Sequence, residues 1–236
     1  MVTGSTSRTP RTRVERQRET REALILAALE AFSRDGYHAT SLESIANDAG
    51  FSKGAVYSNF AGKSDLFLAL MDFNQEMLRD GRWDPFSVAD APDAGTAMPK
   101  TIGGLDIAEM VRGFALATLE FIATAARDEK LALALRERMQ VMIDAYERTA
   151  ADARPSDENL PPEDIARLMT ALDQGASVLA VSGITSMDPA IIRVGLRRLL
   201  DPASAAGEPA PEREELVSFP GVDQVQRLLQ KEARED

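Results

Sequence analysis

Apolar residues recur along most of the chain at the spacing of an α-helix, and no segment shows the strict apolar–polar alternation of a half-buried strand. The first helical segment is expected over 13–34, where apolar residues at positions i, i+3, i+4 and i+7 share one face. Asp35-Gly36 ends it, because glycine readily adopts the left-handed conformation that closes many helices. The pattern predicts an all-α fold. The residues of that first face are Ile25, Ala28, Leu29 and Phe32.

Three further helices are predicted over 41–79. Thr40 and Glu43 form a capping box for a short helix that stops near Gly50. Ser52 is the expected N-cap of the next helix, which reaches about residue 60, and Gly62 opens the third. Two short helices joined by a tight glycine turn are the helix-turn-helix arrangement of many DNA-binding proteins. The sequence therefore predicts a DNA-binding unit that ends at about residue 62.

The second of the two short helices is expected to expose small and hydrogen-bonding residues. Such residues let a helix enter the major groove and offer hydrogen bonds to bases and phosphates. Lys63, at the start of the following helix, is expected to contact a DNA phosphate. The residues predicted to contact DNA are Thr40, Ser41, Ser52, Lys53, Gly54, Ala55, Tyr57, Ser58, Asn59 and Lys63.

Residues 21–67 resemble the DNA-binding domain of the TetR family of transcriptional regulators, over about a fifth of the chain. The resemblance implies a regulator, expected to be a repressor, that binds palindromic operator DNA as a homodimer and responds to a small molecule. It also implies an N-terminal three-helix helix-turn-helix domain followed by a helical ligand-binding and dimerisation domain. The motifs that carry the resemblance are Gly36-Tyr37, Ala39-Thr40-Ser41, Ile45-Ala46, Ala49-Gly50-Phe51-Ser52 and Lys53-Gly54-Ala55-Val56-Tyr57.

The rest of the chain divides into a long loop, a helical region and a tail. The loop at 80–103 is rich in Gly, Pro, Asp and Ala, and is longer than compact domains usually contain without a functional role. Residues 201–236 form an Ala/Pro/Glu-rich tail in which the stretch 222–229 favours a short helix. We assign 1–12 to a basic flexible arm, 13–62 to DNA binding, and 63–200 to ligand binding and dimerisation. Helical patterns in the last of these regions cover 105–127, 129–153, 162–182 and 188–200.

The formal net charge of −11 is distributed unevenly along the chain. Residues 1–63 carry nine Lys or Arg against seven Asp or Glu, whereas residues 64–236 carry eighteen against thirty-one. A local basic segment can neutralise DNA phosphates although the whole chain is acidic. The arginines from Arg8 to Arg18 therefore either strengthen DNA binding or belong to a solvated tail.

The composition excludes several classes of function. The chain has no cysteine and one histidine, His38, which leaves no thiolate metal site, no cysteine nucleophile and no histidine-based catalytic triad. We expect no catalytic residue, no metal, no cofactor and no enzymatic activity. No apolar run reaches the ~20 residues that span a bilayer. The N-terminus lacks a secretory signal, so a cytoplasmic protein without a membrane partner is expected.

The C-terminal helices are rich in methionine and aromatic residues. These either line an adaptable pocket for a largely apolar effector or form ordinary core. Glu120 and Asp173 are lone charges on apolar helices, and each faces either the pocket or water. The predicted pocket residues are Met110, Phe114, Phe121, Met139, Met142, Tyr146 and Met169.

The helical hairpin over 162–200 carries more apolar surface than one helix face needs. With the family resemblance, this predicts a two-fold four-helix interface between subunits; the alternative is a monomer whose last helices close its own core. An architectural DNA-binding dimer without a ligand is the alternative to a ligand-responsive regulator. The predicted interface residues are Leu172, Gly175, Ala176, Leu179, Ile192, Leu196 and Leu199.

Overall fold

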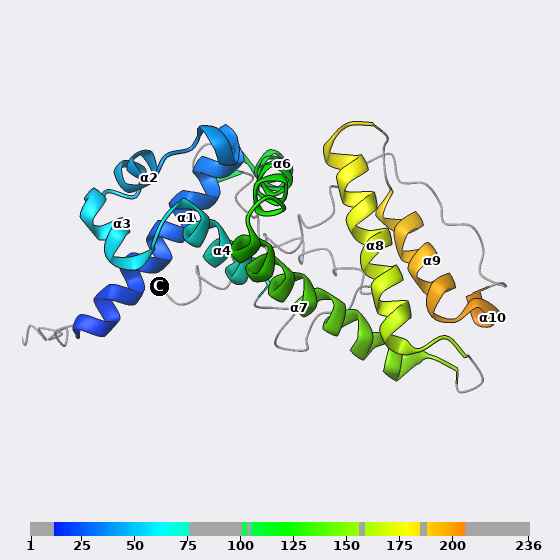
Figure 1. The fold of residues 1–236 in the computed structure, drawn as a ribbon. Helices are drawn as coiled ribbons and strands as arrows, with labels where there is room; N and C mark the ends of the chain where they lie inside the picture. Colours follow the sequence, from blue (N-terminus) through cyan, green and yellow to red (C-terminus); the bar gives the residue numbers. More distant parts are fainter. Residues whose placement is uncertain (1–11, 76–100, 103–104, 156–158, 185–187, 206–236) are drawn as a thin grey trace, which may run out of the picture.

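The computed structural model describes residues 12–75, 101–102, 105–155, 159–184 and 188–205. Residues 1–11 of the predicted arm, most of the predicted loop and the tail from residue 206 lie outside the described residues. As Figure 1 shows, α1 to α4 gather at one end, α8 and α9 lie side by side at the other, and the long α7 runs between them. The elements are α1 (Arg13–Ala39), α2 (Leu42–Asp48), α3 (Lys53–Asn59), α4 (Lys63–Asn74), β1 (Thr101–Ile102), β2 (Leu105–Asp106), α6 (Ile107–Ala125), α7 (Glu129–Ala153), α8 (Pro162–Val181), α9 (Pro189–Leu200) and α10 (Pro202–Ala205).

The predicted all-α fold is confirmed, with one small addition. β1 and β2 pair as a two-residue antiparallel hairpin, with Thr101 opposite Asp106 and Ile102 opposite Leu105. The hairpin leads directly into α6, where the Asp106 side chain caps the helix by accepting from the Ala108 N–H at 2.8 Å. Among the described helices, none is both long and apolar enough to cross a membrane.

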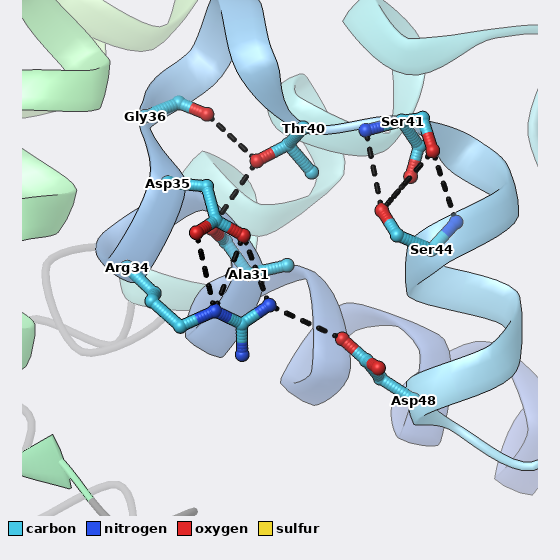
Figure 2. A network of polar contacts seen from close by, with 8 residues as sticks. All are labelled: Ala31, Arg34, Asp35, Gly36, Thr40, Ser41, Ser44 and Asp48. Carbon is cyan, nitrogen blue, oxygen red and sulfur yellow. Dashed lines mark hydrogen bonds and ion pairs between the residues drawn. The ribbon is translucent and has the colours of Figure 1, made fainter.

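α1 continues past its predicted end because the chain kinks at Gly36 and makes one more turn. Gly36 has φ 81° and ψ 170°, which side-chain-bearing residues rarely adopt. After the kink, Ser41 is the N-cap of α2. Its Oγ accepts from the Ser44 N–H at 3.0 Å, and the Ser44 Oγ accepts from the Ser41 N–H at 3.3 Å (Figure 2). The predicted capping box of Thr40 and Glu43 is therefore wrong by one residue, since the Thr40 side chain turns inward.

The first apolar cluster is a continuous core of buried residues from α1 to α4 and from α6. At its centre the rings of Phe67 and Phe121 stack with centroids 4.6 Å apart, and Phe32 meets Phe67 edge-on at 5.0 Å. α6 packs so closely along α1 that a Cβ on Gly113 would lie 2.0 Å from the Ser33 carbonyl oxygen. The three helices of the predicted DNA-binding unit therefore share one core with α4 and α6.

The second apolar cluster joins α7, α8 and α9. α7 links it to the first cluster, because Arg138 reaches α4: its Nε donates to the Leu68 carbonyl at 3.2 Å, and its Nη2 pairs with Asp72. The helix that carries part of the second cluster is thus tied to the helix that follows the DNA-binding unit. The buried residues of the second cluster are Tyr146, Ala150, Ile165, Ala166, Met169, Leu196 and Leu200.

Candidate nucleic-acid interface

α3 is attached to the DNA-binding unit by its inner face, which leaves its outer face in solvent. Val56 and Phe60 lie one helical turn apart, and both are buried in the first apolar cluster. At the end of α3, Arg21 of α1 donates from Nη1 to the Asn59 carbonyl at 2.8 Å, and its Cζ lies 4.3 Å from the centre of the Phe60 ring. The role of Arg21 could not be predicted from the sequence, because no local pattern indicates a contact across 38 residues.

The outer face of α3 carries most of the predicted DNA contacts. Tyr57 is 55% exposed, which is unusual for a large aromatic side chain, because the described part of the chain does not cover it. Lys53 pairs with Glu43 at 3.3 Å, and both side chains are more than half exposed. Such an ion pair contributes about 0–1 kcal/mol, so the ammonium can exchange its partner for a phosphate. The exposed residues of the predicted set are Ser41, Ser52, Lys53, Gly54, Tyr57 and Ser58, and the half-buried ones are Ala55, Asn59 and Lys63.

Hydrogen bonds within α3 fix the orientation of its polar side chains. The Ser52 Oγ accepts from the Ala55 N–H at 3.3 Å, which confirms the predicted N-cap. The Ser58 Oγ and the Asn59 Nδ2 both donate to the Ala55 carbonyl, each at 2.8 Å. With its amide group held in this way, Asn59 keeps its side-chain carbonyl as an acceptor, the group that can bind an amino group of a base.

Thr40 has an internal role. Its side chain is buried, and its Oγ1 donates to the Gly36 carbonyl at 2.7 Å and lies 3.2 Å from the Ala31 carbonyl (Figure 2). These bonds satisfy carbonyl groups near the kink of α1, where the regular helical pattern stops. Beside them, Arg34 reaches Asp48 of α2 at 3.4 Å. The structure therefore assigns the Thr40 side chain to the α1–α2 connection and not to the DNA surface.

Lys63 also has partners within the chain. Its Nζ donates to the carbonyls of Tyr37, Thr40 and His38 at 2.8, 3.0 and 3.1 Å, and it lies 4.6 Å from the centre of the Tyr37 ring. Burial lowers the pKa of Lys63, and the negative charge of Glu120 acts in the opposite direction. All three donors of the ammonium group are used to close the end of α1. A phosphate contact from Lys63 stays a prediction, and the structure adds this structural role.

Glu120 joins α6 to the DNA-binding unit. Its Oε2 accepts from the His38 N–H at 2.9 Å, and a Cβ on Gly36 would lie 2.6 Å from its Oε1. On the same face of α6, the Thr124 Oγ1 lies 3.5 Å from the His38 Nε2. The Glu120 carboxylate therefore faces the end of α1, which is neither of the two positions considered from the sequence.

The predicted pocket residues fall into two groups instead of one. Asp173 lies half-buried beside the second group and is hydrogen-bonded to Tyr146. The residues in or against the first apolar cluster are Met110, Phe114, Phe121 and Met139. Those in or against the second are Met142, Tyr146 and Met169.

Two of the seven predicted interface residues turn inward. Ala176 and Leu196 are buried, and Leu196 is a member of the second apolar cluster. The structure therefore assigns these two residues to the chain's own core and not to a surface that a partner could contact. Among the others, Gly175 is exposed, and the half-buried residues are Leu172, Leu179, Ile192 and Leu199.

Comparison with known sequences gives relatives of two kinds. The family profile described as bacterial regulatory proteins, tetR family, matches residues 24–70. The uncharacterized HTH-type transcriptional regulator Rv2912c of Mycobacterium tuberculosis is 32% identical over 178 residues, which cover 72% of this chain and 86% of the relative. The HTH-type transcriptional activator FasR of Mycolicibacterium smegmatis is 40% identical over 63 residues, which cover 27% of this chain and 29% of FasR. The HTH-type transcriptional repressor BepR of Brucella suis is 41% identical over 71 residues, which cover 28% of this chain and 34% of BepR. The match to FasR and BepR thus spans about a third of their lengths or less.

Solved structures share the fold along most of the chain. Salmonella enterica GusR is 21% identical with a TM-score of 0.50, over 77% of this chain and 95% of that chain. A chain from Rhodococcus sp. assigned to the TetR family is 20% identical with a TM-score of 0.56, over 78% of this chain and 99% of that chain. The likeness extends beyond the helix-turn-helix unit, so it covers the arrangement of the C-terminal helices as well.

Proposed function

Because the chain belongs to the TetR family of bacterial transcriptional regulators, which bind DNA, we propose that it is a ligand-responsive repressor that binds a two-fold symmetric operator as a homodimer. The exposed outer face of α3 is the observation that carries this proposal. Each subunit inserts one α3 into a major groove, and the pair reads half-sites separated by whole turns of the duplex. A small molecule held among the C-terminal helices favours one separation of the two α3 helices and so changes the operator affinity.

Operator binding is tested with a duplex that the wild-type protein selects from a random pool. The double variant Lys53→Ala/Tyr57→Ala should bind this duplex about tenfold to a hundredfold more weakly, because both side chains are exposed on α3 and neither supports the core. Lys130→Ala removes an exposed charge at the start of α7 and is the control, with wild-type affinity expected. Wild-type affinity of the double variant across a salt titration would show that α3 is not the reading helix.

Repression is tested with a reporter gene behind a promoter that contains the selected duplex. Expression should fall when the wild-type chain is produced and should stay high with the double variant. A rise in expression on production of the wild type would make the chain an activator.

An apolar stripe on α8 supports the homodimer. Its two large members, Leu168 and Val178, are 48% and 38% exposed, and Ile191 of the neighbouring α9 is 43% exposed. The small residues between them would let a second α8 approach closely. We locate the interface on this stripe, which includes Gly175 from the predicted set. The stripe consists of Leu168, Ala171, Gly175 and Val178, at positions i, i+3, i+7 and i+10.

Sedimentation at micromolar concentration tests the interface. The wild type should sediment as a dimer, and Val178→Glu should sediment as a monomer, because the two-fold axis would bring the new charges of both subunits into one apolar contact. Leu133→Glu is the control, since Leu133 is exposed (49%, against 38% for Val178) but lies on α7 and is not part of the stripe. A monomeric wild type, or a dimeric Val178→Glu variant, would contradict the assignment.

A further inference from the structure

A half-buried polar cluster lies between α7 and α8, within the second apolar cluster. It consists of Met142, Tyr146, Asp173 and Gln174. The Gln174 Nε2 donates to the Asp173 Oδ2 at 3.1 Å and to the Met142 Sδ at 3.4 Å. The Tyr146 hydroxyl is hydrogen-bonded to the Asp173 carboxylate, and the Tyr146 side chain is almost completely buried.

The hydrogen-bond donors of this polar cluster are used within it, whereas some of its acceptor capacity is not. A glutamine amide has two N–H donors, and Gln174 uses them on Asp173 and Met142. A tyrosine has one O–H donor, which the Asp173 carboxylate accepts. A carboxylate can accept about four hydrogen bonds, so Asp173 retains acceptor capacity while the donors around it are used. A further partner of the polar cluster must therefore be a donor.

The charge of Asp173 has no counterpart in the described part of the chain. The groups that act on it there are Gln174 and Tyr146, and neither is a cation. Burial raises the pKa of Asp173, which means that its ionised form has lost favourable hydration. If Asp173 served only to hold the Tyr146 hydroxyl, an asparagine would accept the same hydrogen bond without that loss. The hydrogen bond to Tyr146 therefore does not require a charged side chain at position 173.

Apolar side chains of three helices pack against the same apolar cluster as Met142 and Tyr146. Ile143 of α7, Leu172 of α8 and Ile192 of α9 are half-buried and pack against the second apolar cluster. They offer apolar contact to a molecule whose charged end meets Asp173. We propose that the polar cluster is the charge-recognising part of the effector site, and that the effector is an amphipathic cation with an apolar body and a protonated amine. This inference rests on the proposed function and replaces the expectation of a largely apolar effector.

The same face of α7 connects this site to α4, the helix that follows the DNA-binding unit. Arg138, Met142 and Tyr146 are spaced at i, i+4 and i+8, so they lie along one face of the helix. Arg138 holds α4 through the Leu68 carbonyl and Asp72. A ligand that shifts Tyr146 or Met142 therefore acts on the helix that is fixed to α4.

Two probes with the same apolar body test the ligand class. Calorimetric titration of the full chain would compare 4-phenylbutylamine, a cation at neutral pH, with 4-phenylbutan-1-ol, which is neutral. The wild type should bind the amine about tenfold or more tightly than the alcohol, because an ammonium–carboxylate hydrogen bond is charge-assisted. Asp173→Asn should bring the ratio of the two affinities to about one. Asp144→Asn removes an exposed carboxylate from α7 and should keep the wild-type ratio.

The wild-type comparison decides the question even if a variant does not fold. If the wild type binds the amine no more tightly than the alcohol, or binds neither, the inference is overturned. A preference for the amine that persists in a folded Asp173→Asn variant overturns it as well. Failure of the proposed function has a different signature, which is a wild-type chain without a probe that selects no duplex from the random pool.

Discussion

Replacement of Gly113 by alanine tests whether α6 and the DNA-binding unit form one rigid body. A Cβ at this position would lie 2.0 Å from the Ser33 carbonyl oxygen and 2.7 Å from its carbonyl carbon. Both are backbone atoms that cannot rotate away. α6 must therefore move off α1 by about 1 Å or more before the contact becomes an ordinary one. This shift loosens the packing of Phe121, the α6 residue whose ring stacks on Phe67 in the first apolar cluster.

The size of the effect follows from two opposing contributions. Alanine in place of glycine inside a helix stabilises it by about 1 kcal/mol. Overpacking of a tight contact costs about 1–3 kcal/mol, and an overlap with backbone lies at the upper end of that range. The net loss in the free energy of unfolding is about 2 kcal/mol, which lowers the Tm of a chain of this size by about 4–8 °C. The operator affinity should fall too, because α1 belongs to the DNA-binding unit.

Thermal unfolding followed by circular dichroism measures this loss. Gly54→Ala is the matched control: Gly54 also lies in a helix, but its nearest neighbour would be the Ser52 Oγ at 3.7 Å, an ordinary contact. This variant should melt at or slightly above the wild-type temperature. If Gly113→Ala also melts at or above that temperature, the close approach of α6 and α1 does not constrain the fold, and the reasoning is wrong.

Lys63→Met removes the charged hydrogen bonds that close α1 and should lower the free energy of unfolding by about 2 kcal/mol. Its control, Lys53→Met, breaks only an exposed ion pair and should change the free energy of unfolding by less than about 1 kcal/mol. Equal losses for the two variants in urea denaturation would contradict the structural role of Lys63. Deletion of residues 1–11 removes two arginines and keeps the Thr12 N-cap of α1. The salt dependence of operator affinity should then fall by about two phosphate contacts, and the selected DNA sequence should not change. Unchanged affinity at low salt would show that the arm is a solvated tail. Because burial raises the pKa of Asp173, the folded state binds this proton more strongly than the unfolded state, and the free energy of unfolding should fall as the pH rises above the ordinary value of 3.8. Asp173→Asn should remove this decline in urea denaturation over an acidic pH series, and a decline of undiminished size would refute the assignment.

Features that depend on neighbours three or four residues apart were predictable from the sequence. The inward face of α1 follows from the helical spacing of its apolar residues, and the Ser52 cap follows from a bond that spans three residues. The sequence alone does not determine the N-cap of α2, because the side chains of Thr40 and Ser41 can both cap a helix. The kink at Gly36 decides between them by directing Thr40 into the core.

Features that depend on contacts between distant residues were not predictable. Lys63 finds its carbonyl partners 23 to 26 residues away, and Glu120 finds the His38 N–H 82 residues away. Part of the apolar surface predicted to be in excess on the helix over 188–200 is covered by the chain's own second apolar cluster, which includes Leu196 and Leu200. An amphipathic pattern tells how much apolar surface a helix must cover, and tertiary packing decides what covers it.

The continuity of the first apolar cluster bears on the design of chimaeric sensors, in which the DNA-reading part of one regulator is joined to the ligand-reading part of another. A junction at residue 62, where the helix-turn-helix motif ends, would separate Phe32 from Phe67 and Phe121, which pack in one aromatic group. A junction at 126–128, between α6 and α7, leaves the buried members of the two clusters intact on either side. The contacts that cross this junction would then have to be carried over to the new partner, among them that of Arg138 with α4 and that of Arg112 with the Val181 carbonyl. The exchangeable module of this chain thus begins after α6, and not where its DNA-binding motif ends.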